Sequence, residues 1–416
     1  MERFIGLIGI VVILGIAFLF SNNRKKINLR LVLSGIGLQV LLAVLILKVG
    51  PVKDFFQMLG SGMQEIEHFA KTGADFVYGG IAAVNGGTGE VQNFATPGSF
   101  VFAFNITATI ILVCALVAIL YYLKVMQFAV SIVAKAMNFV MRVSGAEALS
   151  NVASAFVGQI EAQVMIRPYL ATMTNSELLA SMTGSLACIA GGILIVYRSF
   201  GAKAEYLLAA SMMAAPGALV ISKIIFPETE KSQTMGNVKL EVNSGYTNLI
   251  DAIAHGATDG FKIAMNVLAL LLAFIALVAM LNALLGLLPE SWAGQAITLD
   301  WIFGKLFYPI AWCMGVPPED VNSAATLFGQ KLTINEFVAF KNMTSQAVPL
   351  HTEKGIMITS FAICGFANFS SVGMQIGGIG ALAPERRADL ARLGLKALLG
   401  GTLASYLSGT IAGILY

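Results

Sequence analysis

The chain has 416 residues, of which 57% are hydrophobic and only 12% are charged, and its formal net charge is +3 at pH 7. Ordinary soluble domains carry about twice that share of charged residues, so the composition excludes a soluble globular domain. The small, scattered positive charge gives no basis for a nucleic-acid partner. We therefore expect an integral membrane protein.

A helix needs about 20 mainly apolar residues to cross the hydrocarbon core of a bilayer. Stretches that meet this need are predicted to be transmembrane helices, and they are 4–20, 31–49, 98–123, 177–197, 205–226, 261–288, 355–382 and 393–415. The first one ends at SNNRKK without a small-residue cleavage site, so we interpret it as a helix and not as a signal peptide. The expected fold class is an all-α polytopic membrane protein with about eight transmembrane helices.

Two further apolar stretches, 146–172 and 300–345, are interrupted by polar residues. These are Gln159, Glu161, Gln163 and Arg167 in the first stretch and Gln330, Lys331, Asn335, Glu336 and Lys341 in the second. Ionisable groups at membrane depth normally face protein or water, and irregular backbone is tolerated there only where it is buried or lines a cavity. Both stretches are therefore predicted to be re-entrant hairpins.

Segments 54–71 and 124–144 have the amphipathic pattern of helices that lie in the membrane interface. Packing helices at an oligomer contact would show the same pattern.

The sequence predicts five consecutive parts of the chain. Residues 1–123 contain scaffold helices and an interfacial helix, and residues 124–226 contain the second interfacial helix, first hairpin, broken helix and following helix. Residues 227–298 contain a cytoplasmic segment and a scaffold helix. Residues 299–382 contain the second hairpin and broken helix, and residues 383–416 contain a cytoplasmic loop and the last helix.

Basic residues gather in two loops, and the cytoplasmic loops of membrane proteins carry an excess of Lys and Arg. The residues are Arg24, Lys25, Lys26 and Arg30 after the first helix, and Arg386, Arg387 and Arg392 before the last. Both loops are predicted to be cytoplasmic. With eight crossings, both termini then lie outside the cytoplasm.

A pseudo-repeat joins the hairpins to two glycine-interrupted helices. FVGQIE at 156–161 precedes the break ACIAGGI at 187–193, and LFGQKLTINEF at 327–337 precedes AICGFANFSS at 362–371. Paired, glycine-broken segments in corresponding halves indicate a substrate site near the middle of the membrane in secondary transporters. We expect the site to lie among these four elements.

The residues in these segments suit a ligand that has hydroxyl groups, a polar edge and a flat apolar face. They are the carboxylates Glu161 and Glu336, the amides Gln159 and Asn368, the hydroxyl Ser371 and the apolar side chains Ile193 and Phe366. Each polar residue alone is equally compatible with hydrogen bonding between helices. The inference depends on the matching positions of the two carboxylates.

Three strings resemble the signature segments of the concentrative nucleoside transporter family: GQIEA at 158–162, GQKLTINEFVAF at 329–340 and CGFANFSS at 364–371. PIAWCMGVP at 309–317 is similar to the family's lead-in to the second hairpin, and the resemblance extends over essentially the whole chain. It implies cation-coupled nucleoside import by a homotrimer in the inner membrane, with a transport domain that moves like an elevator against a scaffold. It also implies two groups of contacts: Gln159, Glu161 and Ile193 at the base, and Glu336, Asn368 and Ser371 at the ribose.

The chain departs from the family pattern at the base and at the cation site. Where many members have a Thr within GQTEAP, this chain has Ile160, which would lie beside the base. The resemblance implies a cation site at Ser154, Val157, Cys188 and Ile189, where sodium-coupled members usually have Asn and Ser in place of Ser154 and Cys188. Sulfur suits sodium poorly.

We therefore expect proton coupling, with Glu161 or Glu336 carrying the proton in a low-dielectric cavity. Sodium held by carbonyl oxygens and the Ser154 hydroxyl is the alternative. No other cofactor is expected.

Three other functions compete with nucleoside symport. A membrane-embedded enzyme would need a metal-ligand cluster or a nucleophile–base pair, and the sequence shows neither. A passive channel would need polar groups on continuous helices around a pore. A secondary transporter of another small polar solute, such as a nucleobase, fits the same pattern, so we expect a transporter and not an enzyme.

Overall fold

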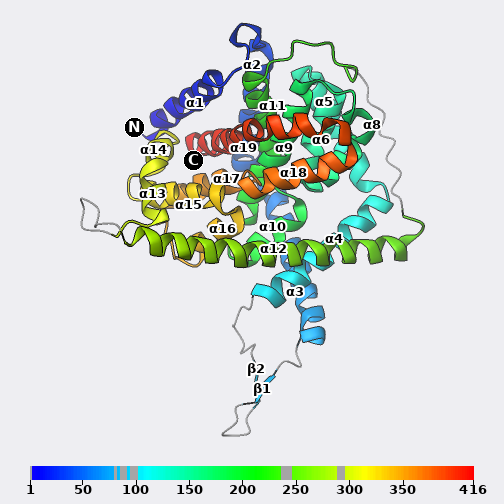
Figure 1. The fold of residues 1–416 in the computed structure, drawn as a ribbon, viewed down its shortest axis with the longest axis vertical. Coiled ribbons are helices and arrows are strands. Elements are labelled where there is room, and N and C mark those ends of the chain that lie inside the picture. Colours follow the sequence, from blue (N-terminus) through cyan, green and yellow to red (C-terminus); the bar gives the residue numbers. More distant parts are fainter. Residues whose placement is uncertain (1, 79–81, 85–90, 94–101, 236–245, 288–295) are drawn as a thin grey trace.

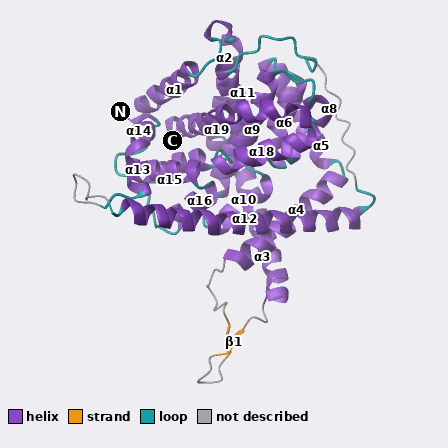
Figure 2. Cartoon of the chain, in the orientation of Figure 1, coloured by secondary structure: helices purple, strands orange, loops and turns teal. Residues whose placement is uncertain are grey.

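The computed structural model describes residues 2–78, 82–84, 91–93, 102–235, 246–287 and 296–416. Helices make up nearly all of this structure (Figure 2), which confirms the all-α class. Among the described residues, one antiparallel pair of short strands, β1 (Ala82–Val84) and β2 (Val91–Asn93), extends beyond the end of α3 (Gly50–Tyr78). The predicted span 98–123 begins with residues 98–101, and the predicted span 261–288 ends at residue 288. These residues lie outside the described part of the chain.

The long apolar helices correspond to the predicted crossings. Within the described part, four segments are long and apolar enough to cross a membrane: α2 (Leu29–Lys48), α11 (Ala204–Ile225), α12 (Leu249–Leu285) and Pro384–Leu415, which combines the short η2 (Pro384–Arg386) with α19 (Arg387–Leu415). A fifth candidate is α4 (Phe102–Tyr122) with α5 (Val125–Met141), which are bent by 75° where Lys124 adopts a left-handed conformation. The shorter α1 (Glu2–Leu19) is linked to α2 through η1 (Arg24–Lys26).

The two remaining predicted spans are each broken into two helices. The 177–197 stretch is α9 (Asn175–Ala187) and α10 (Gly191–Ser199), and the 355–382 stretch is α17 (Glu353–Ile363) and α18 (Phe369–Leu382). Residues 188–190 separate the first pair, and residues 364–368 separate the second. Together with the continuous helices they account for the eight predicted crossings.

Both hairpins form where the sequence predicts them. The first contains α6 (Gly145–Phe156), α7 (Glu161–Met165) and α8 (Arg167–Leu170), and it turns at Gly158, whose φ of +128° favours glycine. The second consists of α15 (Val321–Thr333) and α16 (Glu336–Thr344), and it follows the short helices α13 (Leu299–Leu306) and α14 (Tyr308–Cys313). The Asn335 side chain accepts a hydrogen bond from the Val338 N–H at 3.0 Å, which caps the start of α16.

The helices differ sharply in how much of their surface is covered. The most apolar window of α11 is 89% buried and that of α19 is 83% buried, whereas the window of α12 is 6% buried. Figure 1 shows α12 running along one side of the molecule beside α4, with the broken helices and hairpins gathered around α11 and α19. The protein interior is therefore built around α11 and α19, and α12 presents an apolar surface outward.

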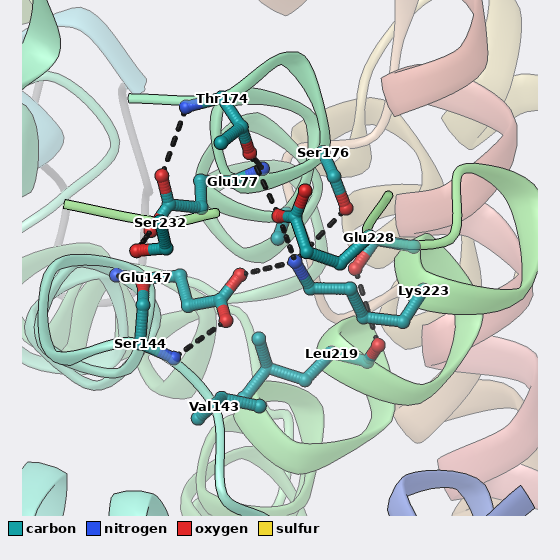
Figure 3. A network of polar contacts seen from close by, with 12 residues as sticks. Val143, Ser144, Glu147, Thr174, Ser176, Glu177, Leu219, Lys223, Glu228 and Ser232 are labelled. Carbon is teal, nitrogen blue, oxygen red and sulfur yellow. Dashed lines mark hydrogen bonds and ion pairs between the residues drawn. The ribbon is translucent and has the colours of Figure 1, made fainter. Parts of the chain in front are cut away.

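A buried ionic network fastens the first hairpin to the end of α11 (Figure 3). The Lys223 ammonium on α11 lies 2.7 Å from a carboxylate oxygen of Glu147 on α6 and 3.4 Å from one of Glu228. It also donates to the Ser176 hydroxyl on α9 at 2.9 Å. Removing one partner of a buried ion pair leaves an uncompensated charge in a medium that solvates it poorly.

We expect Lys223→Met to lower the free energy of unfolding by about 3–5 kcal/mol, because Glu147 would stay buried without its cation. The melting temperature of the purified protein in detergent would measure the loss. The matched control is Lys262→Met, since Lys262 forms an exposed pair with Asp259 and should contribute about 0–1 kcal/mol. Equal melting temperatures for the two variants would show that the network does not stabilise the fold.

Candidate functional site

The breaks in the two interrupted helices touch each other. The Phe366 N–H, in the second break, donates to the carbonyl of Cys188, in the first, at 3.4 Å. Beside it, a Cβ on Gly365 would lie 2.5 Å from the Ala187 carbonyl oxygen, and Gly365 has a φ of +156°. The close approach of the two backbones therefore needs glycine at this position, and it brings the two halves of the pseudo-repeat together.

Glu336 lies at the junction of these elements. It is the first residue of α16 and its side chain is 3% exposed. The Tyr197 hydroxyl on α10 donates to one carboxylate oxygen at 3.0 Å, and the Asn368 amide at the start of α18 donates to the other at 2.8 Å. Elements from both halves of the chain thus hold one buried carboxylate.

Asn368 also begins α18. Its side-chain oxygen accepts from the Ser371 backbone N–H at 2.8 Å and from the Ser370 hydroxyl at 2.7 Å. Ser371, which is 1% exposed, is placed one turn into the helix by this cap. The structure therefore brings together Glu336, Asn368 and Ser371, the three residues that the family resemblance assigns to one group.

The tip of the first hairpin also contacts α18. The Gln159 side-chain nitrogen lies 4.0 Å from the Met374 sulfur, and the buried Gln159 side-chain oxygen has no hydrogen-bond partner among the described residues. Ile160 packs against Gly378, where a Cβ would lie 2.5 Å from the Ile160 Cδ1. An unpaired buried amide oxygen costs about 1–3 kcal/mol, so this group is suited to accept a hydrogen bond from a ligand.

The two apolar residues of the predicted site lie beside these polar groups. Ile193 is half-buried in the first turn of α10, four residues before Tyr197, so the two share one helix face. Phe366 is 9% exposed and sits in the break that precedes Asn368. Ile193 and Phe366 thus lie close in sequence to Tyr197 and Asn368, the two residues that donate to Glu336.

Glu161 lies apart from that group. Its carboxylate folds back over Gly158, where a Cβ would lie 2.5 Å from Glu161 Oε2, and its side chain is exposed in the single chain. Within the described residues, Glu161 is not part of the hydrogen-bonded group formed by Glu336, Asn368 and Ser371.

A polar network connects α6 with α9 at the candidate cation site. The Ser154 hydroxyl donates to the Ser150 carbonyl at 2.7 Å and lies 2.9 Å from the Ser185 hydroxyl. The Cys188 thiol lies 3.9 Å from the Asn151 carbonyl oxygen. Ser154 and Cys188 thus lie on adjacent helices, and the Ser154 hydrogen is already used within α6.

The other two residues of this group, Val157 and Ile189, offer backbone carbonyl groups. Val157 follows the last turn of α6, and Ile189 lies in the first helix break. In the described part of the chain, no backbone hydrogen bond ends on either carbonyl oxygen. The group therefore supplies one hydroxyl, two carbonyl oxygens and a sulfur, a mixed set for a hard cation.

Two residues of the site were not predicted from the sequence, Tyr197 and Lys331. Tyr197 is fully buried and its ring stacks on that of Phe340, with centroids 4.5 Å apart. Lys331 on α15 is also fully buried, and its ammonium has no hydrogen-bond partner in the part that the structure describes. The available signals were the helical spacing from Ile193 to Tyr197 and the presence of Lys331 within the string GQK.

Comparisons with known proteins cover nearly the whole chain. Residues 206–413 match a family described as Na⁺ dependent nucleoside transporter C-terminus, residues 8–81 match the corresponding N-terminus, and residues 103–204 match a family described as nucleoside recognition. The chain is 38% identical over 411 residues to the nucleoside permease NupC of Helicobacter pylori, which covers 98% of this chain and 96% of that protein. It is 42% identical over 410 residues to the uncharacterized transporter YutK of Bacillus subtilis, covering 98% of each.

Solved structures of CNTnw have the same fold. An inward-facing, substrate-bound structure is 39% identical, with a TM-score of 0.89, and the match covers 100% of this chain and 99% of that chain. An outward-facing structure of a CNTnw variant is 39% identical, with a TM-score of 0.90, covering 100% and 97%. The architecture is thus shared with a protein seen in both inward-facing and outward-facing states.

We expect Gly365→Ala to lower the free energy of unfolding by about 1–3 kcal/mol, because the added Cβ would push the two helix breaks apart. The control is Gly373→Ala on α18, where a Cβ meets nothing within 4 Å and helix propensity improves. Thermal melting of both variants in detergent measures the difference. A Gly365→Ala variant as stable as the control would mean that the contact between the breaks is loose.

Proposed function

The chain belongs to the concentrative nucleoside transporter family, and we propose that it imports nucleosides across the plasma (inner) membrane by symport with a proton. It is a multi-pass membrane protein with the fold of an elevator-type transporter, and its relatives are transporters and not enzymes. The observation that supports nucleoside import most directly is the buried group at Glu336, which both halves of the chain build.

The proposed ribose contacts are Glu336, Asn368 and Ser371. An ionised carboxylate accepts hydrogen bonds at both oxygens, and an amide can both donate and accept, so the pair matches two neighbouring hydroxyl groups. Both Glu336 oxygens are within hydrogen-bond distance of neutral donors, Tyr197 and Asn368, which orient the carboxylate. Hydrogen bonds to charged groups contribute about 1.5–3 kcal/mol each.

The proposed base contacts are Gln159, Ile193 and Phe366. The unpaired Gln159 side-chain oxygen can accept from a donor on the base edge. Ile193 and Phe366 offer apolar surface for the flat faces of the ring. Ile160, between the hairpin tip and Gly378, shapes the same wall.

We expect Glu336→Gln to lose most uridine transport and to bind uridine about 10- to 100-fold more weakly, because the amide keeps the shape but not the charge. Uptake into proteoliposomes and calorimetric titration measure the two effects. Asn368→Ala and Ser371→Ala should weaken uridine more than its 2′- and 3′-deoxy analogues. Equal losses for uridine and the analogues would remove these residues from the ribose contact.

The hydrogen bonds of the two carboxylates favour Glu161 as the proton carrier. Tyr197 and Asn368 both donate to the Glu336 carboxylate, and donors of this kind favour the ionised form. Within the described residues, the Glu161 carboxylate forms no ion pair and no hydrogen bond with another side chain, and it accepts from backbone N–H groups at the hairpin tip.

Sodium is the alternative coupling ion. The matching family is described as Na⁺ dependent, and sodium would be held by the carbonyls of Val157 and Ile189 and the Ser154 hydroxyl. Against it stands the soft sulfur of Cys188 and the use of the Ser154 hydrogen within α6. These departures support the proton.

Uridine accumulation in proteoliposomes should follow an imposed inward proton gradient in sodium-free buffer, and a protonophore should abolish it. In the same assay, Glu161→Gln should keep uridine exchange but lose accumulation, because it cannot carry a proton. Accumulation that requires sodium and ignores the pH gradient would contradict proton coupling.

A homotrimer with both termini outside the cytoplasm completes the proposal. The outward apolar surface of α12 must be covered by lipid or by another protomer, which supports a scaffold role for this helix. The basic residues around η1 and at the start of α19 support cytoplasmic loops at those positions.

A further inference from the structure

A lysine without a partner lies inside the second hairpin. Lys331, near the end of α15, is 0% exposed, and its ammonium forms neither a hydrogen bond nor an ion pair with any residue that the structure describes. Fully buried lysines are rare, because a charge taken out of water needs a compensating partner. The buried charge of Lys331 therefore needs a negative group nearby.

The buried carboxylate of the same hairpin is Glu336, which is 3% exposed at the start of α16. The two residues are five positions apart on either side of the hairpin turn, which passes through Ile334 and the cap residue Asn335. The Glu336 carboxylate already accepts from two neutral donors, so the ammonium acts through its charge and not through contact. Together Lys331 and Glu336 form a pair of zero net charge.

We propose that Lys331 is a positioning residue that keeps Glu336 an ionised carboxylate throughout the transport cycle. This inference rests on the proposed function, in which Glu336 receives the ribose hydroxyls. An ionised carboxylate is an acceptor at both oxygens, whereas a protonated one turns an acceptor into a donor and loses the charge-assisted bonds. Lys331 would thereby separate ribose recognition at Glu336 from proton transport elsewhere.

The other titratable groups that interact with the pair are Tyr197 on α10 and Cys364 at the end of α17, and neither supplies a positive charge. Five charged groups on the neighbouring elements have partners of their own. On α13, Asp300 accepts from Gln330 and Lys305 lies over the Trp301 ring. Glu353 on α17 pairs with Lys203, Arg198 on α10 donates to Gln64, and Lys341 on α16 lies over the Phe200 ring. Lys354 on α17 is also buried and is not without a partner. Within the described part of the second hairpin, Lys331 is thus the buried cation that has no other partner.

The test is the dissociation constant of uridine, measured by calorimetry on the full-length purified protein between pH 5.5 and 8.5. We divide the dissociation constant of Lys331→Met by that of the unmodified protein at each pH. This ratio should rise toward acid pH by up to about tenfold per pH unit, because Glu336 takes up a proton in the variant. Lys331→Arg should restore a flat ratio. Lys341→Met, on the same hairpin, is the matched control and should also give a flat ratio.

A purely structural role or a direct contact between Lys331 and uridine would weaken binding by the same factor at every pH, and that result would overturn the proposal. In the Glu336→Gln background, adding Lys331→Met should produce no pH-dependent ratio. Normal uridine binding by Glu336→Gln alone would contradict the proposed ribose contact at Glu336. The role of Lys331, which rests on that contact, would then fail with it.

If Lys331→Met does not fold, Lys331→Gln is the second neutral variant. A further measurement needs no change at Lys331: uridine binding to Glu161→Gln should be flat over the same pH range. A tenfold loss of uridine affinity per pH unit toward acid pH in this variant would show that Glu336 titrates despite Lys331. That result would overturn the proposal.

Discussion

The contact between the two helix breaks is the constraint on which the rest of the site depends. A bilayer offers no water to backbone groups, so irregular backbone at membrane depth is stable only where protein or a lined cavity satisfies it. Here the Phe366 N–H is satisfied by the Cys188 carbonyl, and the side chain of Asn368 caps the helix that resumes. The same interruption that would be costly in lipid places amide, carboxylate and hydroxyl groups in the centre of the protein.

Because each half of the chain contributes one break and one hairpin, neither half can build the site alone. Glu336 belongs to the second hairpin, yet its orientation depends on Tyr197 from the first half and on Asn368 from the second. At another place in the fold, Lys223 joins the first hairpin to α11 through Glu147. Polar contacts of this kind fix the positions of elements that apolar packing alone would leave free to slide.

The class of protein and its repeated elements followed from the sequence, because apolar length and the polar interruptions are local properties. Residues 177–197 and 355–382 were predicted as spans, and their glycine breaks were visible as AGG and CGF, although the ends of the helices were not. Tyr197 and Lys331 were missed as site residues for a physical reason. Their importance depends on burial and on distance to Glu336, and a tyrosine 139 positions away from a carboxylate carries no sign of that contact.

We infer that the buried group at the two breaks recognises a ribose and that a cation gradient drives import. The most direct measurement compares the accumulation of labelled uridine with that of labelled uracil in the same proteoliposomes under the same cation gradients. We predict that uridine is concentrated inside the vesicles and that uracil, which lacks the hydroxyls for Glu336, Asn368 and Ser371, stays at equilibrium. Equal accumulation of uracil and uridine would contradict ribose recognition and would favour a transporter of nucleobases.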